Sequence, residues 1–256
     1  MKLPKELQKK EKAKKEKMSR RSKRKGKGET KKWSKFSNAK KINKFRAIID
    51  SKPSGDIQKQ IYQLKITISN ISPPIWRRIL ILNRENLQVL HKHIQKWFNW
   101  KEAHPHEFFF FPEKDRRSQI RIKGAAGLFA PGPSKNELNE KEVRLYDIFG
   151  MNVKRLWYLY DFGDNWEHEI KLEKVFPYKK DFKKPICVGG KRAGPPEDCG
   201  GPWGYKDLLG ILDDPKHPRH SELSEWVGDN FDPENMGINI EEMTPQEIEQ
   251  KYGSES

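Results

Sequence analysis

Cysteine is nearly absent from this chain of 256 residues, which has only Cys187 and Cys199. Two cysteines are too few for a disulfide framework and suit a reducing compartment. No apolar run reaches the ~18 residues needed to span a bilayer, and the basic N-terminus lacks the apolar stretch of a secretory signal. We therefore expect a cytoplasmic protein without a membrane segment, or a nuclear one if the host is eukaryotic.

Several motifs with known chemistry are also missing. The chain has no Walker A loop, no Gly-x-Gly-x-x-Gly after a strand, no Gly-x-Ser-x-Gly elbow and no Cys-x-x-Cys knuckle. Nucleotide hydrolysis, acyl transfer and a standard zinc finger are therefore unsupported. The sequence assigns no cofactor.

Acidic residues are scarce at the N-terminus. Residues 1–50 contain 21 Lys and Arg against 5 Asp and Glu, which leaves 31 of each sign for the remaining residues. The whole formal charge of +16 is thus confined to the first fifth of the chain. The basic isoelectric point therefore comes from the N-terminal segment, and the rest of the chain is neutral.

This basic segment, residues 1–55, is expected to be a largely disordered arm and linker, because it holds few side chains to bury. Its cations suit phosphates, and its aromatic residues suit stacking on bases. The candidate contacts to nucleic acid are Arg20, Arg21, Lys23, Arg24, Lys25 and Trp33. We expect nucleic acid or a ribonucleoprotein as partner; the alternative is a solvated tail that binds nothing. Apolar residues from Trp33 to Ile49 recur at helical spacing, so this part could dock on the domain or on a partner.

Residues 56–240 have the patterns of a folded domain. An alternating run at residues 61–69 predicts a half-buried strand, and residues 75–82 predict a second one. The apolar spacing over residues 87–98 predicts an amphipathic helix, and residues 106–111 predict another strand. The order indicates an α+β domain with a mostly antiparallel sheet and packed helices. Residues 241–256 are expected to be a frayed acidic tail.

The clearest local feature is a hairpin. Residues 155–162 and 166–175 flank a Gly163-Asp164-Asn165 turn, in which we expect the glycine to adopt a positive φ. On the second strand, Trp166, His168 and Ile170 share the apolar face, while Glu167 points away.

Four segments together resemble one family. They are SPPIWRRILI (72–81), LHKHIQKWFNW (90–100), YLYDFGDNWEHEIKLE (158–173) and CVGGKRAGPPEDCGGPWGYKDLLGILDDPKHP (187–218). Over about residues 60–235 the chain is similar to the plasmid pRiA4b ORF-3-like domain, a family also found beside transposon genes. The resemblance implies a compact α+β domain and, through its neighbours, an association with mobile elements. It implies no reaction. Asn99 stands where the family has glycine and Pro105 where it has leucine, which puts the helix-to-strand junction in doubt.

Some relatives are labelled transposon resolvases, but this chain lacks the required residues. A serine recombinase needs a nucleophilic serine within an arginine cluster, together with a DNA-binding helix-turn-helix. The sequence contains no such combination.

The hairpin and the following Gly/Pro-rich loop hold the candidate catalytic residues. Carboxylates near a histidine occur in acid/base and hard-cation sites. The candidates are Asp161, Asp164, His168, Glu197 and Asp198. The alternative is structural: Asp164 would shape the turn and His168 would be a hydrogen-bonded core histidine.

Three histidines are weaker candidates for metal ligands. His104 and His106 could share a strand face, with His91 arriving from the preceding helix and Asp161 or Asp164 completing a hydrolytic centre. However, Pro105 favours a loop, and His91 lies on the apolar stripe of its helix.

The loop at residues 187–204 is expected to border a ligand pocket beside the hairpin. The proposed wall residues are Trp166, Cys199, Trp203 and Tyr205. The glycines of this loop favour a rigid turn over a zinc site.

Two hypotheses follow. The first is a non-catalytic binding module whose arm contacts nucleic acid while the domain holds a protein, peptide or small ligand. The second is a metal-dependent hydrolase or nuclease that uses the carboxylates and histidines above. The sequence favours the first, and an enzyme is the less favoured outcome.

Overall fold

The computed structural model describes residues 36–51, 57–124, 137–228 and 230–253. The candidate contacts Arg20, Arg21, Lys23, Arg24, Lys25 and Trp33 lie outside the described residues, as does most of the Gly/Pro-rich segment after Lys123. No helix in the described part of the chain has the length and apolar character needed to cross a membrane.

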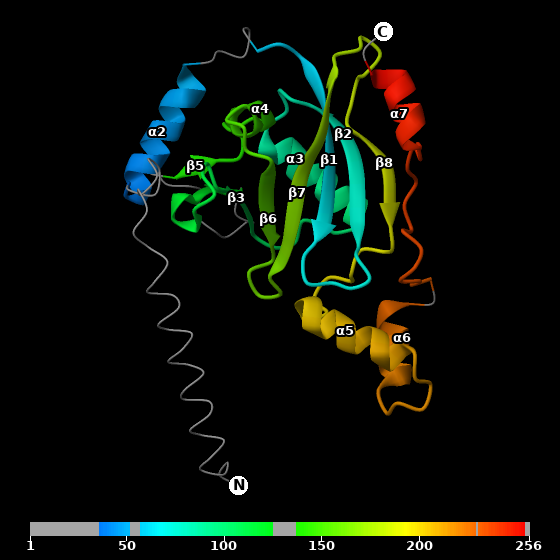
Figure 1. Cartoon of the computed structure of the whole chain (residues 1–256). Coiled ribbons are helices and arrows are strands. Elements are labelled where there is room, and N and C mark those ends of the chain that lie inside the picture. The colour runs from blue at the N-terminus through cyan, green and yellow to red at the C-terminus, as the bar shows by residue number, and fades with distance from the viewer. Residues whose placement is uncertain (1–35, 52–56, 125–136, 229, 254–256) are drawn as a thin grey trace, which may run out of the picture.

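The fold is built on one eight-stranded sheet with the order β5-β4-β3-β6-β7-β1-β2-β8, which confirms the α+β prediction (Figure 1). All neighbouring strands are antiparallel except β4 and β5. The strands are β1 (Gln60–Ile68), β2 (Trp76–Leu82), β3 (His106–Phe110), β4 (Ile120–Lys123), β5 (Leu138–Asn139), β6 (Arg155–Tyr160), β7 (Trp166–Pro177) and β8 (Ile186–Lys191). The helices are α2 (Asn38–Asp50), α3 (Leu87–Phe98), the short 3-10 turn η1 (Arg116–Ser118), α4 (Leu145–Phe149), α5 (Gly201–Leu212), α6 (His220–Val227) and α7 (Pro245–Tyr252).

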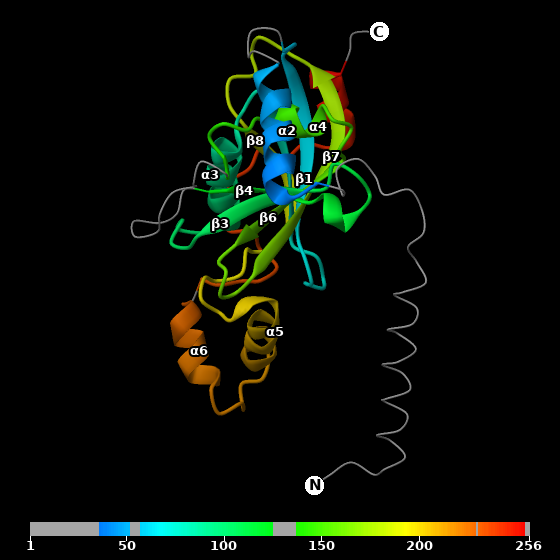
Figure 2. The ribbon, with the colours of Figure 1, turned by 90° about the vertical axis from the view of Figure 1, so that its left-hand side faces the viewer.

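The helix α3 lies against one face of the sheet and builds the main core there (Figures 1 and 2). Its predicted apolar stripe is buried throughout, from Leu87 to Phe98. Asn86 caps the helix by accepting the N–H of Val89, and Asn99 ends it in the left-handed conformation at φ 60°. Asparagine is the residue that best replaces glycine in this conformation, so the departure at Asn99 leaves the junction intact.

The helix α2 shows that part of the N-terminal segment docks on the domain. Phe45 is fully buried, and its ring lies 5.2 Å from that of Phe110 in β3. Lys41 donates a hydrogen bond to the carbonyl of Arg117, and Arg46 donates one to the carbonyl of Glu137 at 2.7 Å. The segment assigned to the arm and linker therefore contains a helix that contacts the domain, as the apolar spacing from Trp33 to Ile49 allows.

The C-terminal segment also differs from the expected frayed tail. Thr244 caps α7 in a capping box with Glu247, and Ile248 and Tyr252 are buried. They pack in a second, smaller core on the sheet face opposite α3, at its β8 end. The acidic composition of this segment gives little sign of a packed helix, but two apolar residues one helical turn apart are enough to dock one.

The stretch just before α7 closes the edge of the sheet. The N–H of Glu241 donates to the carbonyl of Cys187 at 2.9 Å, and that of Met243 donates to Val188 at 3.0 Å. The strand that they cover, β8, falls in a segment that we expected to be a loop. Its pair Gly189-Gly190 hides the strand pattern in the sequence.

Candidate functional site

Three loops meet at the end of the sheet where α5 and α6 project. They are the connection from α3 to β3, the turn between β6 and β7, and the connection from β8 to α5 (Figure 1). Each contributes one side chain to a cluster of His104, Asp161 and Asp198, whose ligand-type atoms all lie within 4.8 Å of one another. In the described part of the chain, this is the one group of three or more His, Cys, Asp or Glu residues with metal-ligand spacing.

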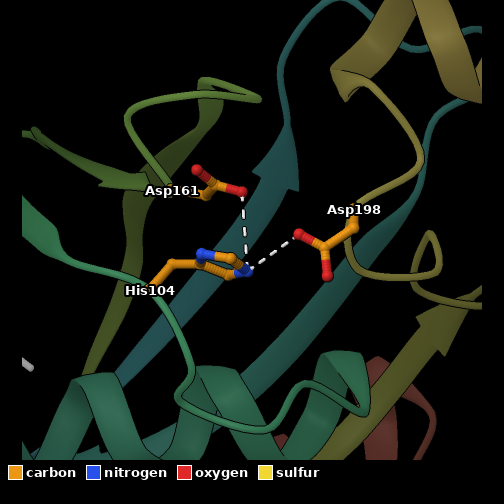
Figure 3. A group of neighbouring side chains, drawn as sticks. All are labelled: His104, Asp161 and Asp198. Carbon is orange, nitrogen blue, oxygen red and sulfur yellow. Dashed lines mark ion pairs between the residues drawn. The ribbon is translucent and has the colours of Figure 1, made fainter.

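The histidine ring stands between the two carboxylates (Figure 3). His104 Nε2 lies 3.2 Å from Asp198 Oδ1 and 3.8 Å from Asp161 Oδ2. The Nε2 atom is buried and makes no hydrogen bond of good geometry to any described residue. The three residues differ in exposure: Asp161 is 7% exposed, whereas the side chains of His104 and Asp198 are 26% and 71% exposed.

The turn between β6 and β7 fixes Asp161. Its Oδ1 atom accepts the N–H groups of Gly163 at 2.8 Å and Asp164 at 3.3 Å, which leaves Oδ2 directed at His104. The positive φ values of this turn fall on Asp161 and Asn165, both at 56°, and not on Gly163 as expected. Asp and Asn tolerate this conformation because their side chains bond to the local backbone.

Two other candidate carboxylates have structural partners. Glu197 accepts the hydroxyl of Tyr160 at 2.5 Å and the N–H of Lys101 at 3.2 Å. Burial and the adjacent Glu197 raise the pKa of Tyr160, so the phenol remains a donor. Asp164 Oδ2 accepts the N–H of Gly200 at 3.0 Å and so ties the hairpin to the start of α5.

His168 lies in the core and not at the cluster. It is fully buried, and its ring packs edge-on against those of Phe98 and Trp100. Its Nδ1 atom lies 3.0 Å from the carbonyl of Trp166. Burial lowers the pKa of His168 to about 4, so the ring is neutral at pH 7.

His91 and His106, the other two candidate metal ligands, form a buried polar network apart from His104. The rings of His91 and His106 stack with centroids 3.5 Å apart. His106 Nε2 lies 2.8 Å from a carboxylate oxygen of Glu140, and His91 Nδ1 lies 2.8 Å from the hydroxyl of Tyr158. Of the three histidines predicted as metal ligands, His91 and His106 thus pack in the core, and only His104 lies beside Asp161.

The four proposed pocket residues do not face a common cavity. Trp166 and Tyr205 are each 1% exposed within the core, whereas Trp203 is 79% exposed on the outer side of α5. Cys199 is half-buried, and burial, together with the nearby Asp164, raises the pKa of its thiol to about 12. That thiol is therefore a poor nucleophile at neutral pH.

A second surface lies on the face of the sheet opposite α3. A groove of about 850 Å³ runs over β3, β4, β6 and β7 there. Its aromatic residues are Phe109, Phe111 and Trp157, and the rings of Phe109 and Trp157 are nearly parallel at 8° with centroids 5.8 Å apart. Its charged residues are Lys114, Arg116, Arg121, Lys154, Arg155, Glu113 and Glu167.

The sequence contained the signal for this surface. In the segment 155–160, Arg155 and Trp157 alternate with the buried Leu156 and Tyr158, so a basic and an aromatic side chain share the outer face. The pairing of Phe109 with both Trp157 and Arg121 depends on strand register, which a single sequence does not give.

Comparison with known proteins agrees with this α+β architecture. The family model of the plasmid pRiA4b ORF-3-like protein matches residues 60–240. An uncharacterized protein named y4hQ from Sinorhizobium fredii (strain NBRC 101917 / NGR234) is 33% identical over 175 residues, covering 66% of this chain and 81% of that protein. A crystal structure described as a protein of unknown function, MM3350 from Methanosarcina mazei Go1, has a TM-score of 0.63 and 38% identity. That match covers 70% of this chain and 96% of the other.

The fold and the matches together define the class of protein, which is an α+β domain built on a single sheet. The chain belongs to the plasmid pRiA4b ORF-3-like family, as the four sequence segments had indicated. These relatives are uncharacterized or of unknown function by their own descriptions.

Proposed function

We propose that this protein is a nucleic-acid-binding module whose open sheet face binds a single strand, with the basic arm adding phosphate contacts. The observation that carries the proposal is the aromatic and basic groove over β3, β4, β6 and β7. Proteins that hold single strands combine aromatic side chains, on which bases stack, with cations along the backbone path.

The aromatic part of the groove is ordered before any base arrives. Phe109 and Trp157 lie opposite each other in the register of β3 and β6, and Phe111 meets Trp157 edge-on at 5.0 Å. The guanidinium of Arg121 lies 5.3 Å from the centre of the Phe109 ring. Such stacking is sequence-tolerant, because every base has a π-face.

The cations of the groove are accessible. The side chain of Arg121, paired with Glu107, is 53% exposed, and that of Arg155, paired with Glu169 at 2.8 Å, is 55% exposed. The pair of Arg155 with Glu169 is exposed on both sides and therefore weak, so a phosphate can replace this carboxylate at little cost. Lys154 is exposed at the same end of the groove.

A second groove, of about 540 Å³, connects this face to the start of α2. Asn38, Lys41 and Arg117 line it, and it shares Arg116 and Arg121 with the first groove. Because the basic arm precedes α2 in the chain, its point of attachment lies beside this groove, in which Arg116, Arg117 and Arg121 accompany Glu107 and Glu137. A strand bound on the aromatic residues would therefore run toward the arm.

The test is fluorescence anisotropy of labelled single-stranded DNA and of RNA of the same sequence, with duplex DNA as a third probe. Removal of one stacking residue costs about 1–3 kcal/mol, so we expect Trp157→Ala to weaken binding by roughly 5- to 150-fold. Trp226→Ala, which removes a Trp 48% exposed on α6, is the matched control and should bind as the wild type does. Equal affinity of the Trp157 and Trp226 variants would reject the sheet face as the binding surface.

The contribution of the arm is measured separately in the full chain. Changing Arg20, Arg21, Lys23, Arg24 and Lys25 to Gln should reduce the slope of log affinity against log salt, by about 0.7 for each lost contact to a single strand. If the slope is unchanged, the arm makes no phosphate contacts.

The second candidate function is a metal-dependent hydrolase or nuclease. The cluster of His104, Asp161 and Asp198 favours it, since it combines two of the predicted catalytic carboxylates with a histidine. Asp164, Glu197 and His168 are not needed for it, because each has a structural partner. This function requires turnover that is lost on exchange of Asp161 or Asp198 while the fold is retained.

A further inference from the structure

From the geometry at the end of the sheet, we infer that His104, Asp161 and Asp198 form a binding site for one first-row divalent cation of the Zn²⁺ or Mn²⁺ type. This inference is independent of the sheet-face groove. It concerns a different part of the molecule and would stand if no nucleic acid bound.

The spacing of the donor atoms is close to that of ligands around one ion. Zinc binds imidazole nitrogen and carboxylate oxygen at about 2.0–2.2 Å, which places neighbouring ligands roughly 3.0–3.5 Å apart. Nε2 of His104 lies 3.2 Å from one carboxylate oxygen and 3.8 Å from the other. The three donor atoms all lie within 4.8 Å of one another, so a common ion would draw His104 toward Asp161 and the exposed Asp198 toward both.

The donors are also pre-positioned. The backbone of the β6–β7 turn holds Asp161 through Oδ1, so that Oδ2 remains for a ligand. Asp161 is 7% exposed, and an ionised carboxylate at such a position needs a counter-charge. Nε2 of His104, buried and without a well-formed hydrogen bond to the described residues, faces the same point.

Contacts beside the ligands support the loops that carry them. Glu197, the neighbour of Asp198, binds Tyr160 and Lys101 with its two oxygens and thereby anchors the loop. The ring of Tyr160 packs edge-on against that of His104 at 5.8 Å. These contacts restrict the positions of the His104 ring and of the loop that carries Asp198.

The donor set selects the class of ion. Mg²⁺ and Ca²⁺ prefer oxygen ligands alone, whereas imidazole suits Zn²⁺ and Mn²⁺ accepts both carboxylate and nitrogen. Three protein donors leave further coordination positions on the side of Asp198, whose side chain is 71% exposed. Those positions would be open to water or to a ligand from solvent.

The experiment is calorimetric titration of chelator-treated, tag-free full-length protein with Zn²⁺, and electron paramagnetic resonance with Mn²⁺. We expect one equivalent of either ion to bind, and Mg²⁺ to compete poorly. Asp198→Asn should weaken binding at least tenfold, because the site loses an anionic donor. Asp207→Asn, an equal change of charge at an exposed position of α5, should leave the affinity unchanged.

His104→Gln provides the second variant and should also weaken binding at least tenfold, with circular dichroism confirming the fold. Weak binding at several sites, unaffected by either variant, would overturn the inference. So would the absence of binding in the wild-type protein at millimolar metal.

Discussion

Buried histidines distinguish this core at the level of single residues. His91 is 5% exposed and His168 is fully buried, and burial lowers the pKa of His91 to about 3. The neighbouring His106 lowers the pKa of His91 further, while Glu140 opposes it. The folded state therefore keeps both His91 and His168 neutral over a pH range in which an unfolded chain would protonate them.

The stability of the protein should fall as pH decreases from about 6.5. Between that value and the folded pKa values of about 3 and 4, the unfolded state binds more protons than the folded state. At about 1.4 kcal/mol per pKa unit, each histidine costs about 2 kcal/mol by pH 5. Urea unfolding at pH 7 and pH 5 measures the difference.

The matched variants are His91→Gln and, outside the core on α6, His220→Gln. The first removes one titrating group, while its amide can still reach the Tyr158 hydroxyl, and should halve the loss of stability between pH 7 and pH 5. The second should retain the full loss. An unchanged pH dependence in His91→Gln would show that other groups cause it.

At the level of elements, short helices with few apolar side chains anchor both ends of the domain. The helix α2 depends on Phe45, and α7 depends on Ile248 and Tyr252, whose ring packs edge-on against that of Phe182 at 5.8 Å. Helices of this length are marginal in isolation, so packing and not propensity maintains them.

Ile248→Ala should therefore lower the free energy of unfolding by about 2–4 kcal/mol, the usual cost of truncating a buried isoleucine. Gln250→Ala, at an exposed position of the same helix, should change it by less than about 0.5 kcal/mol. Chemical unfolding followed by circular dichroism measures both. Protection of the amides of residues 245–252 from hydrogen exchange would show whether α7 detaches first.

At the level of the whole molecule, the sequence predicted those elements whose apolar period was clear. The strand β1 and the helix α3 followed their patterns, since alternation and helical spacing set which side chains are buried. The strand β8 escaped prediction because Gly189 and Gly190 break the pattern. The helical spacing of α2 was visible in the sequence, which left open whether it docks, whereas α7 was not predicted because charged residues surround its few apolar side chains.

The candidate sites were predictable only in part, because both depend on contacts between distant segments. Asp161 and Asp198 were named from sequence, but their meeting with His104 required three loops to converge at one end of the sheet. His91 and His106 instead lie in the core, where their rings stack on each other, and this tertiary contact is not visible in the sequence. The aromatic groove depends on the register of β3 and β6, which no local pattern gives.

The two bonds from Glu241 and Met243 to β8 have a consequence for the behaviour of the protein in concentrated solution. An open edge strand offers unpaired backbone groups to another copy, and natural proteins cover such edges to avoid aggregation. Replacing Glu241 and Met243 by Pro removes both N–H donors, so we expect concentration-dependent association in analytical ultracentrifugation. Glu242→Pro, at the intervening position, is the control and should sediment as the wild type does. The segment that follows the family domain would thus protect the protein against self-assembly.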